Sequence, residues 1–192
     1  MRSIAATFVL SFTFIVAGCQ TPVSPALESG AIGERGSQDV IGVQTKATGG
    51  GHYTIPDGID LGFAFSALVL PDGRANGNFR HHGIADGELI DFKAEVTCLS
   101  VDSVNHRAWI GGVITENRST HPQFTTPIHQ AGHDIWFRVQ DNGPGLSDTT
   151  PDVTTIVGFE SPAIPSSIFY CTTQPWRTNN VWPVRGNLTV SP

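Results

Sequence analysis

Short runs of alternating apolar and polar residues recur along most of this chain, and Gly, Pro, Asn and Asp separate them. The longest run covers residues 88–101. Its apolar positions, on the face expected to meet the core, are Ile90, Phe92, Ala94, Val96 and Cys98. Because successive side chains of a strand point to opposite faces, alternation with a period of two predicts β-strands rather than helices.

The same pattern predicts the whole set of strands. They are expected at residues 60–70, 76–84, 88–101, 107–116, 134–140, 153–159, 168–171 and 184–190, with one more at 40–45 if that weaker run is counted. Strands and helices do not alternate, so a parallel sheet is not expected. We predict an all-β domain over residues 40–192, an antiparallel sandwich or a small closed barrel of about eight strands. Periodicity does not separate these two architectures.

The N-terminus has the pattern of an export signal. Arg2 is followed by an uncharged apolar stretch at residues 4–16, too short to span a bilayer. The segment Val16-Ala17-Gly18-Cys19 resembles the lipobox of bacterial lipoproteins. The resemblance implies that residues 1–18 are removed and that Cys19 is acylated, which would anchor the protein stably in a membrane. The alternative is an ordinary signal peptide with a cysteine that falls by chance near the cleavage site.

Residues 19–39 would then join the lipid to the domain. This segment contains Ser, Pro and Gly and no aromatic residue, which predicts a flexible tether. In enteric lipoproteins of the kind that this motif resembles, an Asp after the cysteine favours the inner membrane. Gln20 stands there instead, which favours the outer membrane or cell surface. We expect a protein of the bacterial cell envelope that faces the periplasm or the exterior. The formal net charge of −6 disfavours nucleic acid as a partner.

Two cysteines remain, Cys98 and Cys171. An even pair in an exported protein predicts a disulfide, with two buried free thiols as the alternative. No basic residue stands beside either cysteine to lower its pKa, so neither is a candidate nucleophile.

A loop rich in carboxylate and amide oxygens is the only candidate calcium site. Its ligands would be Asp141, Asn142, Asp148 and Asp152, but their order does not follow the EF-hand. The alternative is a turn that connects two strands. His121, His129 and His133 match no zinc spacing, and His81 and His82 would point to opposite faces of one strand. We therefore expect no cofactor other than, at most, calcium.

Several short motifs resemble a group of small secreted β-rich bacterial domains without a known activity. They are Phe63-Ala64-Phe65, Val96-Thr97-Cys98-Leu99, Ala108-Trp109-Ile110-Gly111-Gly112 and Val139-Gln140-Asp141-Asn142-Gly143. The resemblance implies a fold and no chemistry. Residues 117–132 and the tail at 172–192 depart from the pattern of the group.

No hydrolase elbow, zinc-protease motif or phosphate-binding loop occurs in the sequence. We predict a non-enzymatic domain with a binding or envelope-structural role. The alternative is a calycin-like barrel that carries a small apolar ligand between Phe63, Phe65, Phe92 and Phe137. Trp109 and Trp136 alternate with core positions and should point outward or into a second layer.

Overall fold

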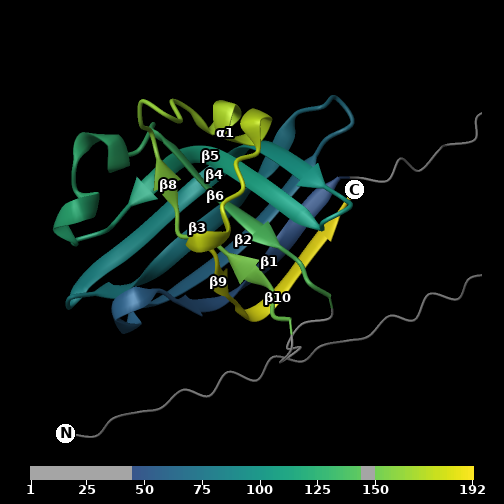
Figure 1. Cartoon of the computed structure of the whole chain (residues 1–192). Helices are drawn as coiled ribbons and strands as arrows, with labels where there is room; N and C mark the ends of the chain where they lie inside the picture. Colours follow the sequence, from purple (N-terminus) through teal and green to yellow (C-terminus); the bar gives the residue numbers. More distant parts are fainter. Residues whose placement is uncertain (1–44, 144–149) are drawn as a thin grey trace, which may run out of the picture. The chain divides into compact units, whose positions relative to one another are not determined.

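The described part of the computed structural model, residues 45–143 and 150–192, is built around one antiparallel sheet (Figure 1). Its strand order is β10-β1-β2-β3-β4-β5-β6-β7-β9, and β8 also pairs with β6. The all-β prediction is confirmed, and the sheet curls into a nearly closed barrel rather than a sandwich. The strands are β1 (Lys46–Thr54), β2 (Asp60–Val69), β3 (Ala75–Ala85), β4 (Glu88–Asp102), β5 (Arg107–Asn117), β6 (Asp134–Gln140), β7 (Val153–Thr154), β8 (Gly158–Phe159), β9 (Trp182–Pro183) and β10 (Arg185–Ser191).

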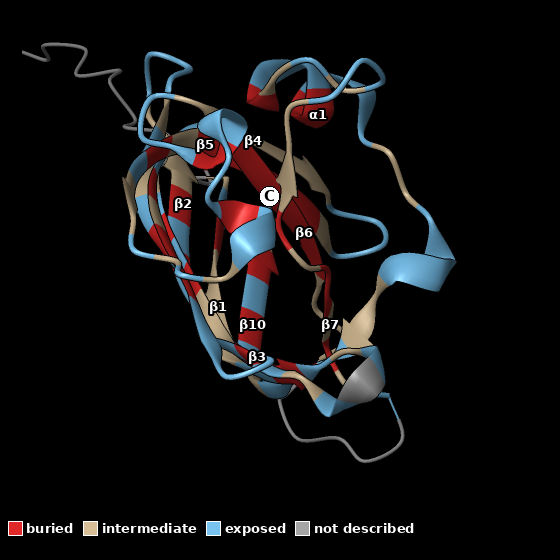
Figure 2. Ribbon diagram, turned by 90° about the vertical axis from the view of Figure 1, so that its left-hand side faces the viewer, coloured by how far each residue is buried: buried red, intermediate tan, exposed pale blue. Residues whose placement is uncertain are grey.

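In the described part of the chain, helical structure is limited to short segments between strands. They are the α-helix α1 (Ser167–Thr173) and the 3₁₀ turns η1 (Pro56–Gly58), η2 (Pro122–Phe124), η3 (Pro127–His129) and η4 (Thr178–Asn180). Figures 1 and 2 show α1 on the outer face of the barrel, where it contacts β4, β5 and β6.

The curvature of the sheet coincides with glycines at which neighbouring strand backbones lie in close contact. A Cβ atom at Gly77 would lie 1.9 Å from the carbonyl oxygen of Ser66, and one at Gly112 would lie 2.1 Å from that of Glu95. Register shifts in the pairing of β4 with β5 mark two bulges, one in β5 at Thr115, opposite Lys93 and Ala94, and one in β4 at Thr97, between Val96 and Cys98. Glycines and bulges of this kind allow a strand to turn a barrel corner.

Two carboxylates help to close the barrel where β10 meets the end of β6. The backbone N–H of Leu188 donates to Oδ2 of Asp152 at 2.9 Å, and that of Val190 donates to Oδ2 of Asp141 at 3.1 Å. Leu188 and Val190 are two residues apart, so their N–H groups point to the same edge of β10. The edge of β10 that faces away from β1 therefore finds its acceptors in side chains rather than in a neighbouring strand.

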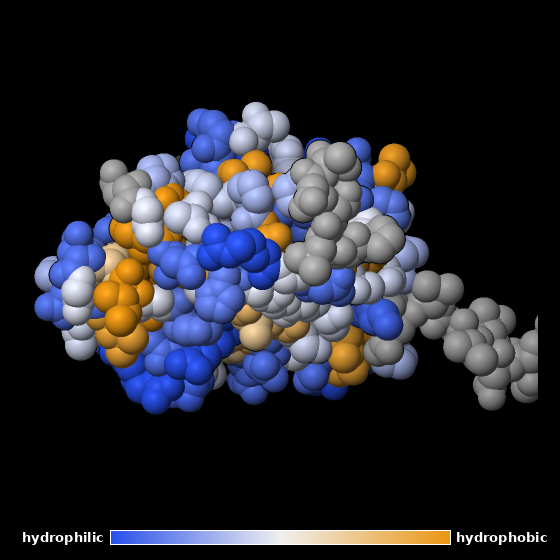
Figure 3. Space-filling model, turned by 90° about the horizontal axis from the view of Figure 1, so that it is seen from below, coloured by the Kyte–Doolittle hydropathy of each residue, from blue (hydrophilic) through white to orange (hydrophobic). Residues whose placement is uncertain are grey.

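Aromatic rings fill the described interior. Phe63, Phe65, Phe79 and His81 all contact Phe137, with ring centroids 4.7–6.4 Å apart. A second group of rings packs around Phe92 and consists of Phe124, His129 and Phe159. Figure 2 shows the buried positions along the strands and the exposed ones mainly in the connections. The face seen in Figure 3 is mostly hydrophilic, with separate groups of hydrophobic atoms.

Most predicted strands are found, but three predictions need correction. Residues 168–171 form part of α1 instead of a strand. Residues 153–159 form two separate two-residue strands, β7 and β8. The weak run at 40–45 lies, except for Thr45, outside the described residues, and the strand that follows it, β1, was not predicted.

Candidate functional site

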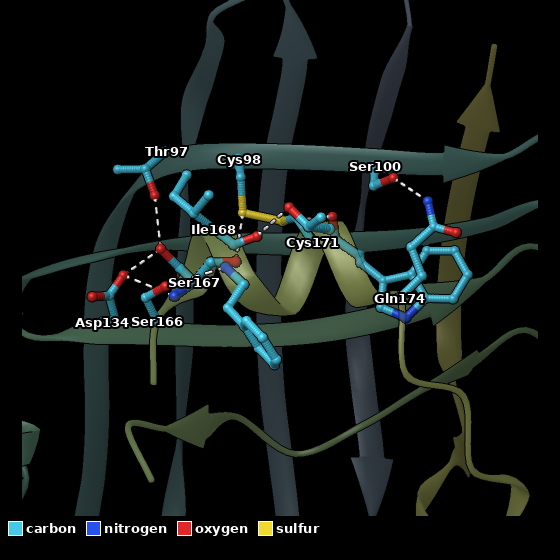
Figure 4. Close-up of a disulfide and its surroundings, with 12 residues drawn as sticks. Thr97, Cys98, Ser100, Asp134, Ser166, Ser167, Ile168, Cys171 and Gln174 are labelled. Carbon is cyan, nitrogen blue, oxygen red and sulfur yellow. Dashed lines mark hydrogen bonds between the residues drawn. A yellow bond between two sulfur atoms is a disulfide. The ribbon is translucent and has the colours of Figure 1, made fainter. Parts of the chain in front are cut away.

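Helix α1 is attached to the outer face of the sheet by polar contacts and a disulfide (Figure 4). Ser166 caps the helix by accepting a hydrogen bond from the N–H of Phe169 at 3.1 Å. The side chain of Ser167 is buried, donates to the carboxylate of Asp134 and lies 3.1 Å from Oγ1 of Thr97. These contacts hold the first turn of α1 on β4 and β6.

The disulfide joins Cys171 of α1 to Cys98 of β4, with a Cα–Cα distance of 6.2 Å. The prediction that Cys98 faces the core is wrong. The bulge after Val96 turns Cys98 to the outer face, while Leu99 packs against the core. Gly111 faces Cys98 from β5, and a Cβ there would lie 2.6 Å from the sulfur of Cys98. The absent side chain leaves room for the helix.

A further group of aromatic side chains, separate from the two in the barrel interior, lies under α1 on the outer face of the sheet. Trp136 stacks on Tyr170 with a ring distance of 5.5 Å, and Trp109 meets the edge of Trp176 at 6.0 Å. Nε1 of Trp109 donates to the carbonyl oxygen of Pro175 at 2.9 Å. Trp109 and Trp136 are only 3% and 5% exposed, so both project into a second layer instead of reaching solvent.

Arg138 lies in this layer, on the same face of β6 as Trp136. The residue is 7% exposed, and its guanidinium lies 5.1 Å from the ring centre of Trp176. Nη2 donates to the carbonyl oxygen of Arg177 at 2.8 Å, whereas the buried Nε has no hydrogen-bond partner among the described residues. Burial raises the pKa of the Tyr170 phenol to about 12, although the charge of Arg138 acts in the opposite direction.

These residues border a groove of about 340 Å³, which we call the Arg138 groove. It is lined by Trp136, Arg138, Thr155, Ile156, Val157, Gly158, Ala163, Ile164, Tyr170, Pro175, Arg177 and Asn180. The volume falls at the lower end of the range typical of small-molecule sites. Its walls present polar and apolar surface in similar amounts, and the only charged residues among these are arginines.

The four phenylalanines predicted to line a cavity occupy the barrel interior. Phe63 and Phe65 contact Phe137 at 6.4 and 5.2 Å, and Phe92 packs in the other ring group. All four are at most 6% exposed and pack against neighbouring rings. In the structure these side chains form core contacts.

The candidate calcium ligands are brought together only in part. Asp141, Asn142 and Asp152 are neighbours, and Asp148 lies outside the described residues. Oδ1 of Asp152 accepts the N–H of Asn142 at 2.8 Å, and Oδ1 of Asp141 accepts that of Gly143 at 2.9 Å. Burial raises the pKa of Asp152. These carboxylates therefore accept backbone hydrogen bonds from the turn after β6 and from the edge of β10 that faces away from β1.

The histidines are dispersed. His81 is 3% exposed inside the barrel while His82 is less buried on the outer side, as their positions in the strand predicted. His121, His129 and His133 contact Asp86, Thr126 and Glu160 respectively. Within residues 45–143 and 150–192, no group of three or more His, Cys, Asp or Glu could hold a metal ion.

Sequence reasoning missed Arg138. Ile135, Phe137 and Val139 lie in the core, as the alternation of apolar and polar residues along 134–140 predicts. One signal in the sequence does point to Arg138. It lies on the same face as Trp136, and a strand with apolar residues on both faces is typically buried on both sides.

Fold and groove define the class of this protein: an antiparallel β-barrel with a disulfide-attached helix and an external groove. Comparisons with known proteins find no match to the chain, neither with a protein-family model nor with a curated protein nor with a solved structure.

Proposed function

We propose that this chain is a lipid-anchored, non-enzymatic binding protein of the bacterial cell envelope. Cys19 would carry the lipid, residues 20–39 would give the domain reach, and the Arg138 groove would hold a small ligand. The observation that carries the binding role is the groove itself, in which a buried arginine lies beside apolar and aromatic walls. None of the described helices is long and apolar enough to cross a membrane.

The anchor is tested by Cys19→Ser in cells that export the protein. We expect the native chain in the membrane fraction and the variant in the soluble fraction. The matched control is Ser24→Ala, which changes the tether and leaves the lipobox intact. Equal membrane attachment of native and Cys19→Ser chains would overturn the anchor.

The binding role is tested by filling the groove. Ala163 is exposed and lines the groove, so Ala163→Trp should occupy its space without disturbing the core. Ala131→Trp makes the same change at an exposed position that does not line it. Native mass spectrometry of the full chain purified from its own membranes should show a bound small molecule that only Ala163→Trp removes. A ligand retained by both variants, or no ligand on the native chain, would contradict the proposal.

A carrier of apolar ligands, similar to the calycins, is a second candidate. The observation that favours it is His81, whose Nε2 is buried inside the barrel without a hydrogen-bond partner among the described residues. The neutral probe N-phenyl-1-naphthylamine tests it directly. A fluorescence increase that Ala163→Trp leaves unchanged and Phe65→Trp abolishes would favour a ligand in the interior over one in the groove.

A further inference from the structure

Arg138 is a buried cation that has no counter-ion within residues 45–143 and 150–192. Among the described residues no carboxylate forms an ion pair with it, and its hydrogen-bond partners are neutral groups, the backbone carbonyl of Arg177 and the phenol of Tyr170. Burial of a charge is costly unless the charge is paired and hydrogen-bonded. By contrast, Asp91 of β4, which is similarly buried, is paired with both Arg80 and Arg118. A buried guanidinium that borders a groove is therefore suited to receive an anion from outside.

The charges around the groove reinforce this preference. Arg138 and Arg177 are the charged residues that line it, and no acidic side chain is among its described lining residues. The whole chain carries a net charge of −6, so the groove is a positive site in an acidic protein. Arg107 adds a third guanidinium nearby, 4.1 Å from the ring centre of Trp176. A local field of this sign attracts anions and rejects cations.

The apolar walls define the rest of the ligand. Ile156, Val157, Ile164 and Pro175 line the groove together with Trp136 and Tyr170. Trp136 and Tyr170 stack on each other and are only 5% and 2% exposed. The partly exposed Ile156, Ile164 and Pro175 therefore supply most of the apolar contact, and they favour a ligand with an apolar body because its binding buries their surface. A groove of about 340 Å³ has room for a body of one or two rings.

We propose that the Arg138 groove binds a small carboxylate with an apolar body. This proposal rests on the binding role proposed above and names its ligand class. The carboxylate forms a charge-assisted hydrogen bond with the guanidinium of Arg138, and Arg177 adds a second, more exposed positive charge at the rim. A carboxylate is preferred to a phosphate because its single charge balances the single buried cation. The ligand body contacts the apolar wall.

The test uses the full chain in detergent and isothermal titration with three probes of the same shape. They are 2-naphthoate, the neutral 2-naphthalenemethanol and the cationic 2-naphthylmethylammonium. We expect 2-naphthoate to bind at least about 10-fold more tightly than the alcohol, the difference that one charge-assisted hydrogen bond supplies. The ammonium probe should bind more weakly than either. Inorganic phosphate and acetate serve as anions that lack the apolar body, and both should bind more weakly than 2-naphthoate.

Variants assign the effect to the groove. Arg138→Gln should remove the preference for 2-naphthoate over the alcohol, and Arg177→Gln should reduce it by a few-fold. Because Arg177 is exposed, its variant keeps the assignment testable if Arg138→Gln fails to fold. Arg74→Gln is the matched control, since Arg74 is exposed and pairs with Asp72 in the turn between β2 and β3.

The possible failures are distinct. Equal affinity for 2-naphthoate and the alcohol, absence of 2-naphthoate binding, or equal loss in Arg74→Gln would each overturn the carboxylate assignment. Tighter binding of inorganic phosphate than of 2-naphthoate would replace it with a phosphate site. The proposed binding role is tested separately, by whether Ala163→Trp removes a native ligand in mass spectrometry. That result does not depend on the outcome of these titrations.

Discussion

Asp152 should contribute strongly to the stability of the barrel, because its carboxylate accepts hydrogen bonds from two backbone N–H groups where β10 closes the sheet. Its carboxylate accepts the N–H of Leu188 at 2.9 Å and that of Asn142 at 2.8 Å, and the residue is only 4% exposed. Asp152→Ala removes both acceptors where water has little access. Each unpaired buried polar group costs about 1–3 kcal/mol, so losing both acceptors should lower the free energy of unfolding by about 2–6 kcal/mol.

Urea denaturation followed by tryptophan fluorescence measures this change, and hydrogen exchange of the Leu188 amide locates it at β10. Asp102→Ala is the matched control. Asp102 also accepts two backbone N–H groups, from Val104 at 3.1 Å and Asn105 at 3.2 Å, but in a solvent-exposed turn. Water replaces an exposed acceptor, so its denaturation midpoint should stay near that of the native protein. If Asp152→Ala and Asp102→Ala unfold at the same urea concentration, the buried hydrogen bonds of Asp152 do not contribute more to stability than the exposed ones of Asp102, and the reasoning is refuted.

Two further perturbations test the attachment of α1 and the barrel interior. The double variant Cys98→Ser/Cys171→Ser opens a span of 73 residues and should lower the free energy of unfolding by about 2–4 kcal/mol. Calorimetry checks this, and an unchanged Tm under oxidising conditions would refute it. Burial lowers the pKa of His81 from 6.5 to about 3, so the folded state holds the neutral ring. Stability present above pH 6.5 should therefore be lost as the pH falls towards 3, because the unfolded chain binds the proton. His81→Phe should flatten this part of the pH profile, and an identical slope in the variant would contradict the assignment.

Strand positions were largely predictable because alternation is a local property. The runs expected at residues 60–70, 88–101 and 134–140 agree with β2, β4 and β6 to within one or two residues. Strand β1 was missed because Gly49, Gly50 and Gly51 interrupt its apolar pattern, although it pairs along its length with both β2 and β10. The run at 168–171 was assigned to a strand because four apolar or small residues do not reveal a period.

The candidate site was less predictable, because its members come from separate segments. Trp136 and Arg138 lie on β6, Tyr170 on α1, and Trp176 and Arg177 on the segment that follows α1. No spacing in the sequence indicates that these residues meet. Local reasoning suggested that Trp136 leaves the core face, but it did not show what covers that face.

By itself, the sequence determined the all-β class, the limits of most strands and the resemblance of residues 16–19 to a lipobox, because each depends on neighbours along the chain. Tertiary structure decided that the sheet curls into a barrel, that a bulge turns Cys98 outward and that α1 covers a second aromatic layer. It also placed Arg138 in that layer without a carboxylate partner among the described residues. Burial and pairing are properties of contacts between distant segments, and a period of two along one strand carries no information about them.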